Sequence, residues 1–169
     1  KKISNSIIQS ISNGERISII SDAGTPIISD PGLIIVKECI KKKIDIFPIP
    51  GVSAVSTAMS VSGFDDQYFF YGFLQKKSSL IEKEINKIKD YDVNIVFFVP
   101  AVKINFYIKY FKKFFKGRNI FIGREMTKIH ETFYRENLDK FSGFKENLKG
   151  ELTVVLSKKI NNTTQKNFF

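Results

Sequence analysis

The sequence predicts an α/β fold whose sheet consists mainly of parallel strands. Short apolar runs of strand length alternate with amphipathic stretches of helical spacing along most of the 169 residues. Loops rich in Gly, Pro, Ser and Asp follow the first two apolar runs, at the strand ends where such sheets bind ligands. Near Asp65-Asp66 the composition changes from small residues to aromatic residues and Lys. We therefore expect a domain boundary there, between residues 1–65 and residues 66–169.

The apolar runs predict six strands, because each is four to eight residues long and is bounded by turn residues. They cover residues 17–20, 44–49, 68–74, 94–99, 119–124 and 151–157. The intervening stretches predict helices. One carries Ile7, Ile8 and Ile11 on a single face and ends at Asn13-Gly14, and the others cover residues 31–43, 53–62, 78–89, 101–116 and 136–148.

Turn and capping residues fix several of these boundaries. Asp30 is the expected N-cap of the helix at residues 31–43, with Pro31 at its first position. Gly63 and Gly117 end two later helices. The polar tail at residues 161–169 is expected to fray.

The composition restricts the classes of function. The net charge of +10, from 27 Lys and Arg against 17 Asp and Glu, favours a polyanionic partner such as RNA, although a global Lys, Ile, Asn and Phe bias explains it equally well. With Cys39 and His130 the only residues of their types, an internal disulfide, a Cys-rich zinc site and a multi-histidine metal site are all excluded. No apolar run is long enough to span a bilayer, so the cytoplasm is the simplest compartment.

The loop at residues 21–32 is the first candidate ligand site. Gly24 allows close backbone approach, and Ser21 and Thr25 offer hydroxyl groups. Asp22 and Asp30 would repel a phosphate, and neither a P-loop nor a dinucleotide fingerprint is present. The loop therefore suits a cationic or zwitterionic ligand, unless it is an ordinary turn that caps the next helix.

Two further segments carry candidate side chains. In residues 48–54, Ser53 and Ala54 offer backbone N–H groups and space for a flat ring at a helix start, although a tight turn capped by Ser53 is the alternative. In residues 124–131, Glu125 and Lys128 could orient a hydroxyl or a phosphate group. His130 could act as a base, although a lone His in a charged loop is more often a solvated surface residue.

Taken together, these segments resemble a known family. The succession S-D-A-G-T-P-x-x-S-D-P-G, P-x-P-G-x-S-A, G-F-L, R-E-x-T-K and G-E-L is similar to the ribosomal RNA small-subunit methyltransferase I family of the tetrapyrrole-methylase superfamily. The resemblance runs from about Ile7 to Leu156.

The resemblance implies two α/β domains that bind S-adenosylmethionine, with the first domain truncated, and a homodimer. It implies 2′-O-methylation of a cytidine ribose in 16S ribosomal RNA of the small ribosomal subunit. Glu125 would orient the hydroxyl and Lys128 would contact a neighbouring phosphate. The implied cofactor-binding residues, on two turns that should lie side by side and at two later positions, are Ala23, Gly24, Thr25, Ile28, Ser53, Ala54, Val99 and Arg135.

The sequence departs from the family pattern in two places. The family's opening strand with its Pro-Ile-Gly-Asn-type loop, and the Ala-Glu-Asp-Thr-Arg segment after it, are not found. Residues 99–103 read Val-Pro-Ala-Val-Lys where the family commonly has Glu-Ser-x-His-Arg. Two alternatives therefore stand beside the leading interpretation: a methyltransferase of the same fold acting on a tetrapyrrole, and a non-catalytic fragment of the family.

Overall fold

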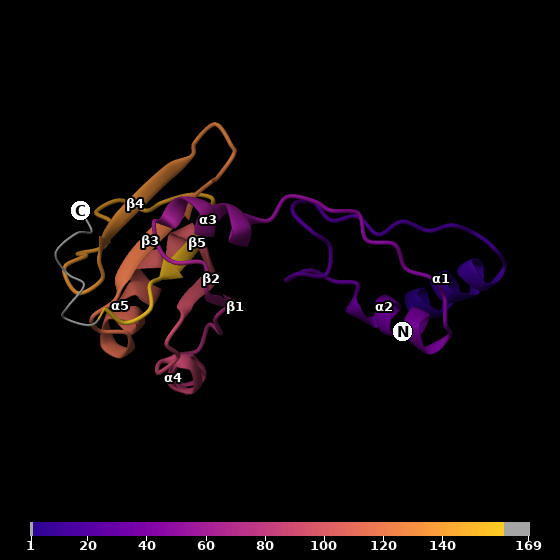
Figure 1. The fold of residues 1–169 in the computed structure, drawn as a ribbon, viewed down its shortest axis with the longest axis horizontal. Helices are drawn as coiled ribbons and strands as arrows, with labels where there is room; N and C mark the ends of the chain where they lie inside the picture. Colours follow the sequence, from indigo (N-terminus) through magenta and orange to yellow (C-terminus); the bar gives the residue numbers. More distant parts are fainter. Residues whose placement is uncertain (1, 161–169) are drawn as a thin grey trace. The chain divides into compact units, whose positions relative to one another are not determined.

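The computed structural model of the chain describes residues 2–160, and the predicted frayed tail at residues 161–169 lies outside that range. The contacts divide the chain into two compact units, Lys1–Ser53 and Ala54–Phe169. Figure 1 colours both units along the sequence. The domain boundary expected at residue 65 stays a prediction.

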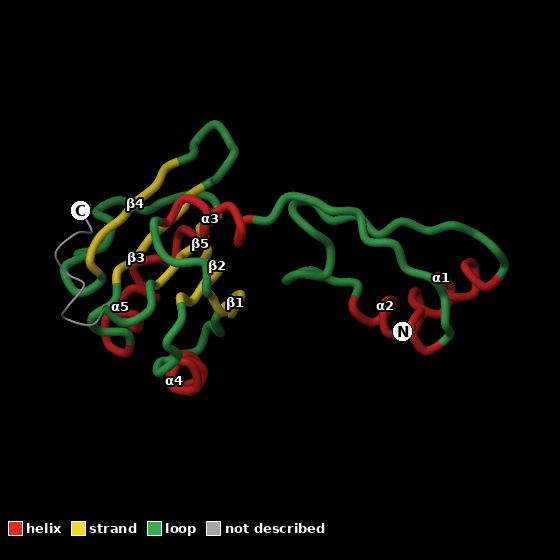
Figure 2. The backbone as a smooth tube through the Cα atoms, in the orientation of Figure 1, coloured by secondary structure: helices red, strands yellow, loops and turns green. Residues whose placement is uncertain are grey.

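The first unit contains two helices, α1 (Lys2–Ser12) and α2 (Leu33–Lys41), joined by loops (Figure 2). Helix α1 confirms the predicted apolar face, with Ile8 buried. It ends as expected, because Gly14 adopts a φ of 94° and donates its N–H to the Ile11 carbonyl at 2.9 Å. Helix α2 buries Cys39.

Three predictions for this unit are wrong. Residues 17–20 and 44–49 form no strand among the described residues, and Ile20 and Phe47 are 88% and 83% exposed. An apolar run becomes a buried strand only when neighbouring strands and helices cover it, and the described part of the unit supplies no such neighbours. Asp30 does not cap α2, since Gly32 occupies the N-cap position and Asp30 lies in the preceding turn.

The second unit is built on a five-stranded sheet with the order β1-β2-β5-β3-β4. The strands are β1 (Tyr68–Phe73), β2 (Asn94–Pro100), β3 (Asn119–Arg124), β4 (Thr132–Asn137) and β5 (Glu151–Leu156). Only β1 and β2 pair in parallel, while β5 is antiparallel to both of its neighbours and β3 is antiparallel to β4. The predicted α/β class is therefore correct, but the sheet is mixed and the expectation of mainly parallel strands is wrong.

Helices cover both faces of this sheet (Figure 1). On one face α4 (Ser78–Ile88) and α5 (Ile104–Phe114), which follows the short helix η1 (Ala101–Lys103), enclose the larger core around Phe97 and Phe111. On the other face α3 (Ala54–Ser62) packs Val55 and Ala58 against Val96. Because successive strand residues point to opposite faces, β2 contributes to both cores.

The predicted helix at residues 136–148 is wrong. Its first residues belong to β4, and irregular chain follows. The apolar residues of this segment have helical spacing, but they pack against the core from irregular chain. They are Leu138, Phe141, Phe144 and Leu148. The side chain of Asn105 replaces part of the missing helical bonding, since it donates to the Phe144 carbonyl at 2.8 Å and accepts from its N–H at 2.9 Å.

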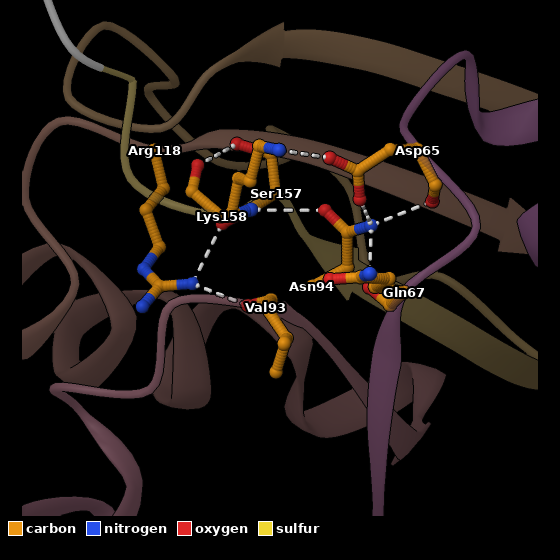
Figure 3. Close-up of polar contacts among 7 residues, drawn as sticks. All are labelled: Asp65, Gln67, Val93, Asn94, Arg118, Ser157 and Lys158. Atoms are coloured by element: carbon orange, nitrogen blue, oxygen red, sulfur yellow. Dashed lines mark hydrogen bonds and ion pairs between the residues drawn. The ribbon is translucent and has the colours of Figure 1, made fainter.

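A polar network joins the strand ends at one end of the sheet (Figure 3). We call it the Arg118 network, and its members are Asp65, Asn94, Arg118, Ser157 and Lys158. The guanidinium of Arg118, only 3% exposed as a residue, donates to the carbonyls of Ser157 at 2.8 Å and Val93 at 2.9 Å. Burial lowers the pKa of this guanidinium from its ordinary value.

Asn94 continues the network across the strand ends (Figure 3). Its amide donates to the carbonyls of Asp65 at 2.7 Å and Gln67 at 2.9 Å, and its carbonyl accepts the Lys158 N–H at 2.9 Å. Lys158 also forms an ion pair with the Asp65 carboxylate at 2.5 Å. The starts of β1, β2 and β3 and the end of β5 are therefore fixed together.

Candidate functional site

The first candidate segment is a tightly turned loop. Gly24, Ile27 and Ser29 adopt φ angles of 74°, 76° and 66°. Such a conformation is unusual for a β-branched residue such as Ile27. The Ser21 hydroxyl donates to the Gly24 carbonyl at 3.0 Å and closes the turn. Ala23 and Ile28 lie on its exposed surface.

The second candidate loop lies against the first within the same unit. The Thr25 hydroxyl donates to the Val52 carbonyl, with an Oγ1···O distance of 3.4 Å. A Cβ at Gly24 would lie 3.7 Å from the same carbonyl oxygen, and one at Gly51 would lie 3.7 Å from Thr25 Oγ1. Because Val52 directly precedes Ser53 in the chain, Thr25 lies close to Ser53. The expectation that the two turns lie side by side is confirmed.

The charge of the first loop suits a cationic group. Residues 17–36 contain two acidic residues, Asp22 and Asp30, and neither Lys nor Arg. Both carboxylates are exposed. Gly24 and Gly51 carry no side chain that would shield the backbone of the loops, and the two carboxylates suit a sulfonium nucleotide such as S-adenosylmethionine better than an anion.

The third candidate segment follows β3 and is bound to the start of β5. We call this arrangement the Glu125 cluster, and its members are Arg124, Glu125, Lys128, Gly150 and Glu151. Glu125 Oε1 accepts the Glu151 N–H at 2.8 Å, and the Glu125 N–H donates to the Glu151 carbonyl at 3.1 Å. Lys128 Nζ lies 3.3 Å from Glu125 Oε1 and 3.2 Å from Glu151 Oε2.

The contact between Glu125 and the start of β5 requires glycine at position 150. A Cβ at Gly150 would lie 2.5 Å from Glu125 Oε1, and the φ of Gly150 is 96°. Glu125 itself adopts a φ of 46°, which turns its side chain back toward β5. Its carboxylate therefore occupies space that only glycine leaves open.

Two members of the cluster, Glu125 and Lys128, are held in their charged forms by each other and by Glu151. The hydrogen bond from the Glu151 N–H lowers the pKa of Glu125, and Lys128 lowers it further. The hydrogen bonds to Glu125 and Glu151 raise the pKa of Lys128. Glu125 is thus a fixed carboxylate that already accepts a backbone hydrogen bond, while the half-exposed ammonium of Lys128 is accessible to an anion.

The remaining predicted residues lie in different surroundings. Val99 is 2% exposed and belongs to the larger core, so a ligand could reach only its backbone. The Arg135 guanidinium stacks on Phe121 and Phe133, with distances of 5.0 and 5.7 Å to the ring centroids, and donates to the Val61 carbonyl. His130 is exposed. Ala54 is an exposed residue at the start of α3.

Sequence reasoning missed two members of the Glu125 cluster, Gly150 and Glu151. Both residues belong to the G-E-L motif, but the motif gave no hint of their contact with Glu125. Glu125 lies 25 or more residues earlier in the chain, and only the pairing of β3 with β5 brings it to them. Within the described part of the chain, no group of three or more His, Cys, Asp or Glu side chains is placed to hold a metal ion. No helix of residues 2–160 is long and apolar enough to cross a membrane.

Comparison with protein families and curated relatives identifies the family. The family described as Tetrapyrrole (Corrin/Porphyrin) Methylases matches residues 1–142. The ribosomal RNA small subunit methyltransferase I of Thermotoga maritima is 36% identical over 162 residues, which cover 94% of this chain and 72% of that protein. The protein of the same name from Mesomycoplasma conjunctivae is 34% identical, with 93% and 66% covered, and that from Buchnera aphidicola is 36% identical, with 97% and 61% covered.

Solved structures support the fold. The methyltransferase CobJ matches with a TM-score of 0.69 and 15% identity, covering 92% of this chain and 70% of that one. A uroporphyrin-III C-methyltransferase from Thermus thermophilus, complexed with S-adenyl homocysteine, matches with a TM-score of 0.61 and 9% identity, covering 92% and 72%. The motifs, the fold and the relatives agree: the chain belongs to the ribosomal RNA small subunit methyltransferase I family of the tetrapyrrole methylases, a family of S-adenosylmethionine-dependent methyltransferases.

Proposed function

We propose that this protein transfers a methyl group from S-adenosylmethionine to the 2′-hydroxyl of a cytidine ribose in 16S ribosomal RNA. The observation that carries the proposal is the contact between the two glycine-bearing loops, through the Thr25 hydroxyl and the Val52 carbonyl. It stands beside the family membership and the names of the relatives. The chain spans 72%, 66% and 61% of the lengths of three of them, so the activity of the whole protein is part of the proposal.

The residues proposed to hold the cofactor lie mainly on the two loops. Ala23, Gly24 and Thr25 would present backbone and a hydroxyl to it, and Ser53 and Ala54 would border its flat ring. Ile28 would add an apolar contact, since this residue is 53% exposed. Val99 would contribute through its backbone only, and Arg135 only after leaving the rings on which it stacks.

In methyl transfer the main task of the protein is to align the ribose hydroxyl with the methyl group. S-adenosylmethionine supplies a methyl group whose leaving group is activated by the positive charge on sulfur. The protein's own task is to hold the ribose hydroxyl in line with that methyl and to exclude water. Lys128 would contact a phosphate next to the reacting ribose. Glu125 would orient the hydroxyl from its fixed position on Gly150 and Glu151.

A matched pair of glycine variants tests the cofactor site. In Gly24→Val a branched side chain would project toward the Val52 carbonyl and cover the backbone proposed to meet the cofactor, so we expect calorimetric titration of the variant protein to detect no binding of S-adenosylmethionine. Gly14→Val is the control, because Gly14 also has a positive φ but a Cβ added there would meet no atom within 4 Å. Equal affinity in both variants would contradict the proposed site.

The substrate is tested separately by mass mapping of RNA from small ribosomal subunits after incubation with the protein and the methyl donor. We expect a single methylated cytidine ribose. Methylation of porphyrin-type substrates alone would favour a tetrapyrrole methyltransferase, and methylation of neither would favour a non-catalytic member of the family. A cytoplasmic homodimer is part of the same proposal, and light scattering of the purified protein tests the dimer.

A further inference from the structure

The carboxyl end of β1 carries an exposed aromatic and basic surface that the proposed reaction does not use. We call it the Phe73 surface. Its residues line an open, shallow hollow: Phe73, Leu74, Gln75, Lys76, Lys77 and Leu80. Phe73 is 55% exposed, and Lys76 and Lys77 are exposed beside it. A large aromatic side chain is thus held in solvent next to two cations.

The backbone beneath this surface is fixed. The Tyr107 hydroxyl donates to the Gln75 carbonyl at 3.2 Å, and the Gln75 N–H donates to Glu84 Oε2 at 3.1 Å. The Phe73 ring packs edge-on against Phe98, with 5.4 Å between the centroids. The surface is therefore presented by a rigid turn, and its ring loses little freedom when a ligand stacks on it.

The Phe73 surface and the Glu125 cluster lie at the same end of the sheet. Phe73 pairs with Phe98 near the end of β2, and Pro100 at that end pairs with Glu151. The positive end of the α4 dipole also points to this turn, because α4 begins at Ser78. A ligand on this surface therefore meets positive charge and lies on the same side as the residues proposed to contact the RNA.

We propose that the Phe73 surface binds single-stranded RNA, with a base stacked on the Phe73 ring and phosphates paired with Lys76 and Lys77. Aromatic rings flanked by Lys are the elements with which proteins bind unpaired nucleotides, whereas the bases of an A-form duplex are stacked inside it and cannot reach such a ring. The inference rests on the proposed function, and it adds the segment of RNA next to the modified nucleotide to the recognised substrate.

Anisotropy of an end-labelled single-stranded RNA, titrated at several salt concentrations, tests the surface. We expect Lys76→Ala/Lys77→Ala to reduce the slope of log affinity against log salt by about 1.4, at about 0.7 per phosphate contact. The control is Lys87→Ala/Lys116→Ala, which removes two exposed lysines near the opposite end of the sheet and should leave the slope unchanged. Equal slopes for the two double variants would overturn the proposal.

The ring is tested with two conservative variants that keep the turn folded. Phe73→Leu keeps an apolar side chain but loses the stacking surface, so we expect affinity for the single strand to fall about tenfold, whereas Phe73→Tyr should bind like the original protein. Equal affinity of the Leu and Tyr variants would contradict a stacking role. The methyl-transfer assay on the unaltered protein is independent: RNA binding that follows this pattern without methyl transfer would reject the proposed function and not the surface.

Discussion

The two ends of the sheet in the second unit are held together by opposite means. At one end Arg118, Asn94 and Ser157 of the Arg118 network are buried, and the guanidinium and amide groups bond to backbone carbonyls. At the other end the Glu125 cluster is formed by charged side chains that stay partly exposed, with Lys128 half exposed and Glu151 at 82%. A buried network can stabilise the fold but cannot reach a ligand, whereas an exposed one adds little stability and remains available for binding.

This difference indicates where selection for stability and for function can act separately. The Arg118 network lies at the starts of β1, β2 and β3, on the end of the sheet away from the candidate RNA-binding residues. Substitutions there should change the free energy of unfolding without touching a ligand. Substitutions in the Glu125 cluster should mainly change ligand binding and cost less stability than those at Arg118, with the largest stability loss in the cluster at Gly150.

The largest expected effect is at Arg118. Arg118→Ala leaves the buried Ser157 carbonyl and the partly buried Val93 and Tyr91 carbonyls without their donor, and it removes the guanidinium from the Phe115 ring, 5.4 Å away. We expect the free energy of unfolding to fall by about 3 kcal/mol or more. Arg124→Ala, which removes one bond to the Lys149 carbonyl, should cost about 1 kcal/mol or less. Urea titrations of both variants measure the difference, and equal losses would remove the distinction between the two ends.

Gly150 should give the next largest effect. In Gly150→Ala the new methyl group must displace the Glu125 carboxylate in addition to adopting a left-handed conformation, so we expect a loss of about 2–3 kcal/mol. Gly117→Ala, also at positive φ but with nothing within 4 Å, should lose about 1 kcal/mol. In a Glu125→Ala background the loss at Gly150 should shrink to that of the control. A loss that persists there would mean that the carboxylate is not the obstacle.

Glu125→Gln should have a smaller effect that depends on pH. The Glu151 N–H keeps the pKa of Glu125 below its ordinary value of 4.5, so the folded protein binds this proton more weakly than the unfolded chain. Its contribution to stability is therefore complete above pH 4.5 and is lost as the pH falls through the folded pKa. We expect the gap between the melting temperatures of the two proteins to narrow progressively as the pH is lowered below 4.5. A gap that stays constant over this range would argue against the ionised contact.

The smallest effect on stability is expected for Lys128→Met. The two ion pairs of Lys128 are exposed, so the free energy of unfolding should change by about 0.5 kcal/mol or less. Under the proposed function, kcat/KM for methyl transfer to small subunits should nevertheless fall about tenfold, because a charged contact to phosphate is lost. A variant that is both stable and fully active would leave Lys128 outside the site.

The sequence predicted the second unit better than the first. Strands β1, β2, β3 and β5 and helices α4 and α5 follow the expected positions closely, because their apolar runs are buried by partners within the same unit. Residues 17–20 have an equally apolar pattern, yet Ile17 and Ile20 are exposed. Hydrophobic periodicity indicates which residues favour burial, but it does not indicate whether other strands or helices cover them.

The candidate site was also predictable only in part. The contact between Thr25 and the Val52 carbonyl follows from two glycine turns that each suit a ligand. The contact of Glu125 with Gly150 depends on β5 lying beside β3 rather than at an edge, which no local pattern encodes. Leu138 and Phe144 produced a false helix because burial of an irregular segment can imitate helical spacing.

The central place of β5 has a consequence for how the protein is made. Strand β5 is the last strand of the described chain, yet it lies between β2 and β3 and bonds to both. While the polypeptide is emerging from the ribosome, β1 with β2 and the hairpin of β3 with β4 must wait as separate pieces until residues 151–156 arrive. The sheet can close only after residues 151–156 have been synthesised, which leaves its apolar faces open to chaperones, or to aggregation, until then.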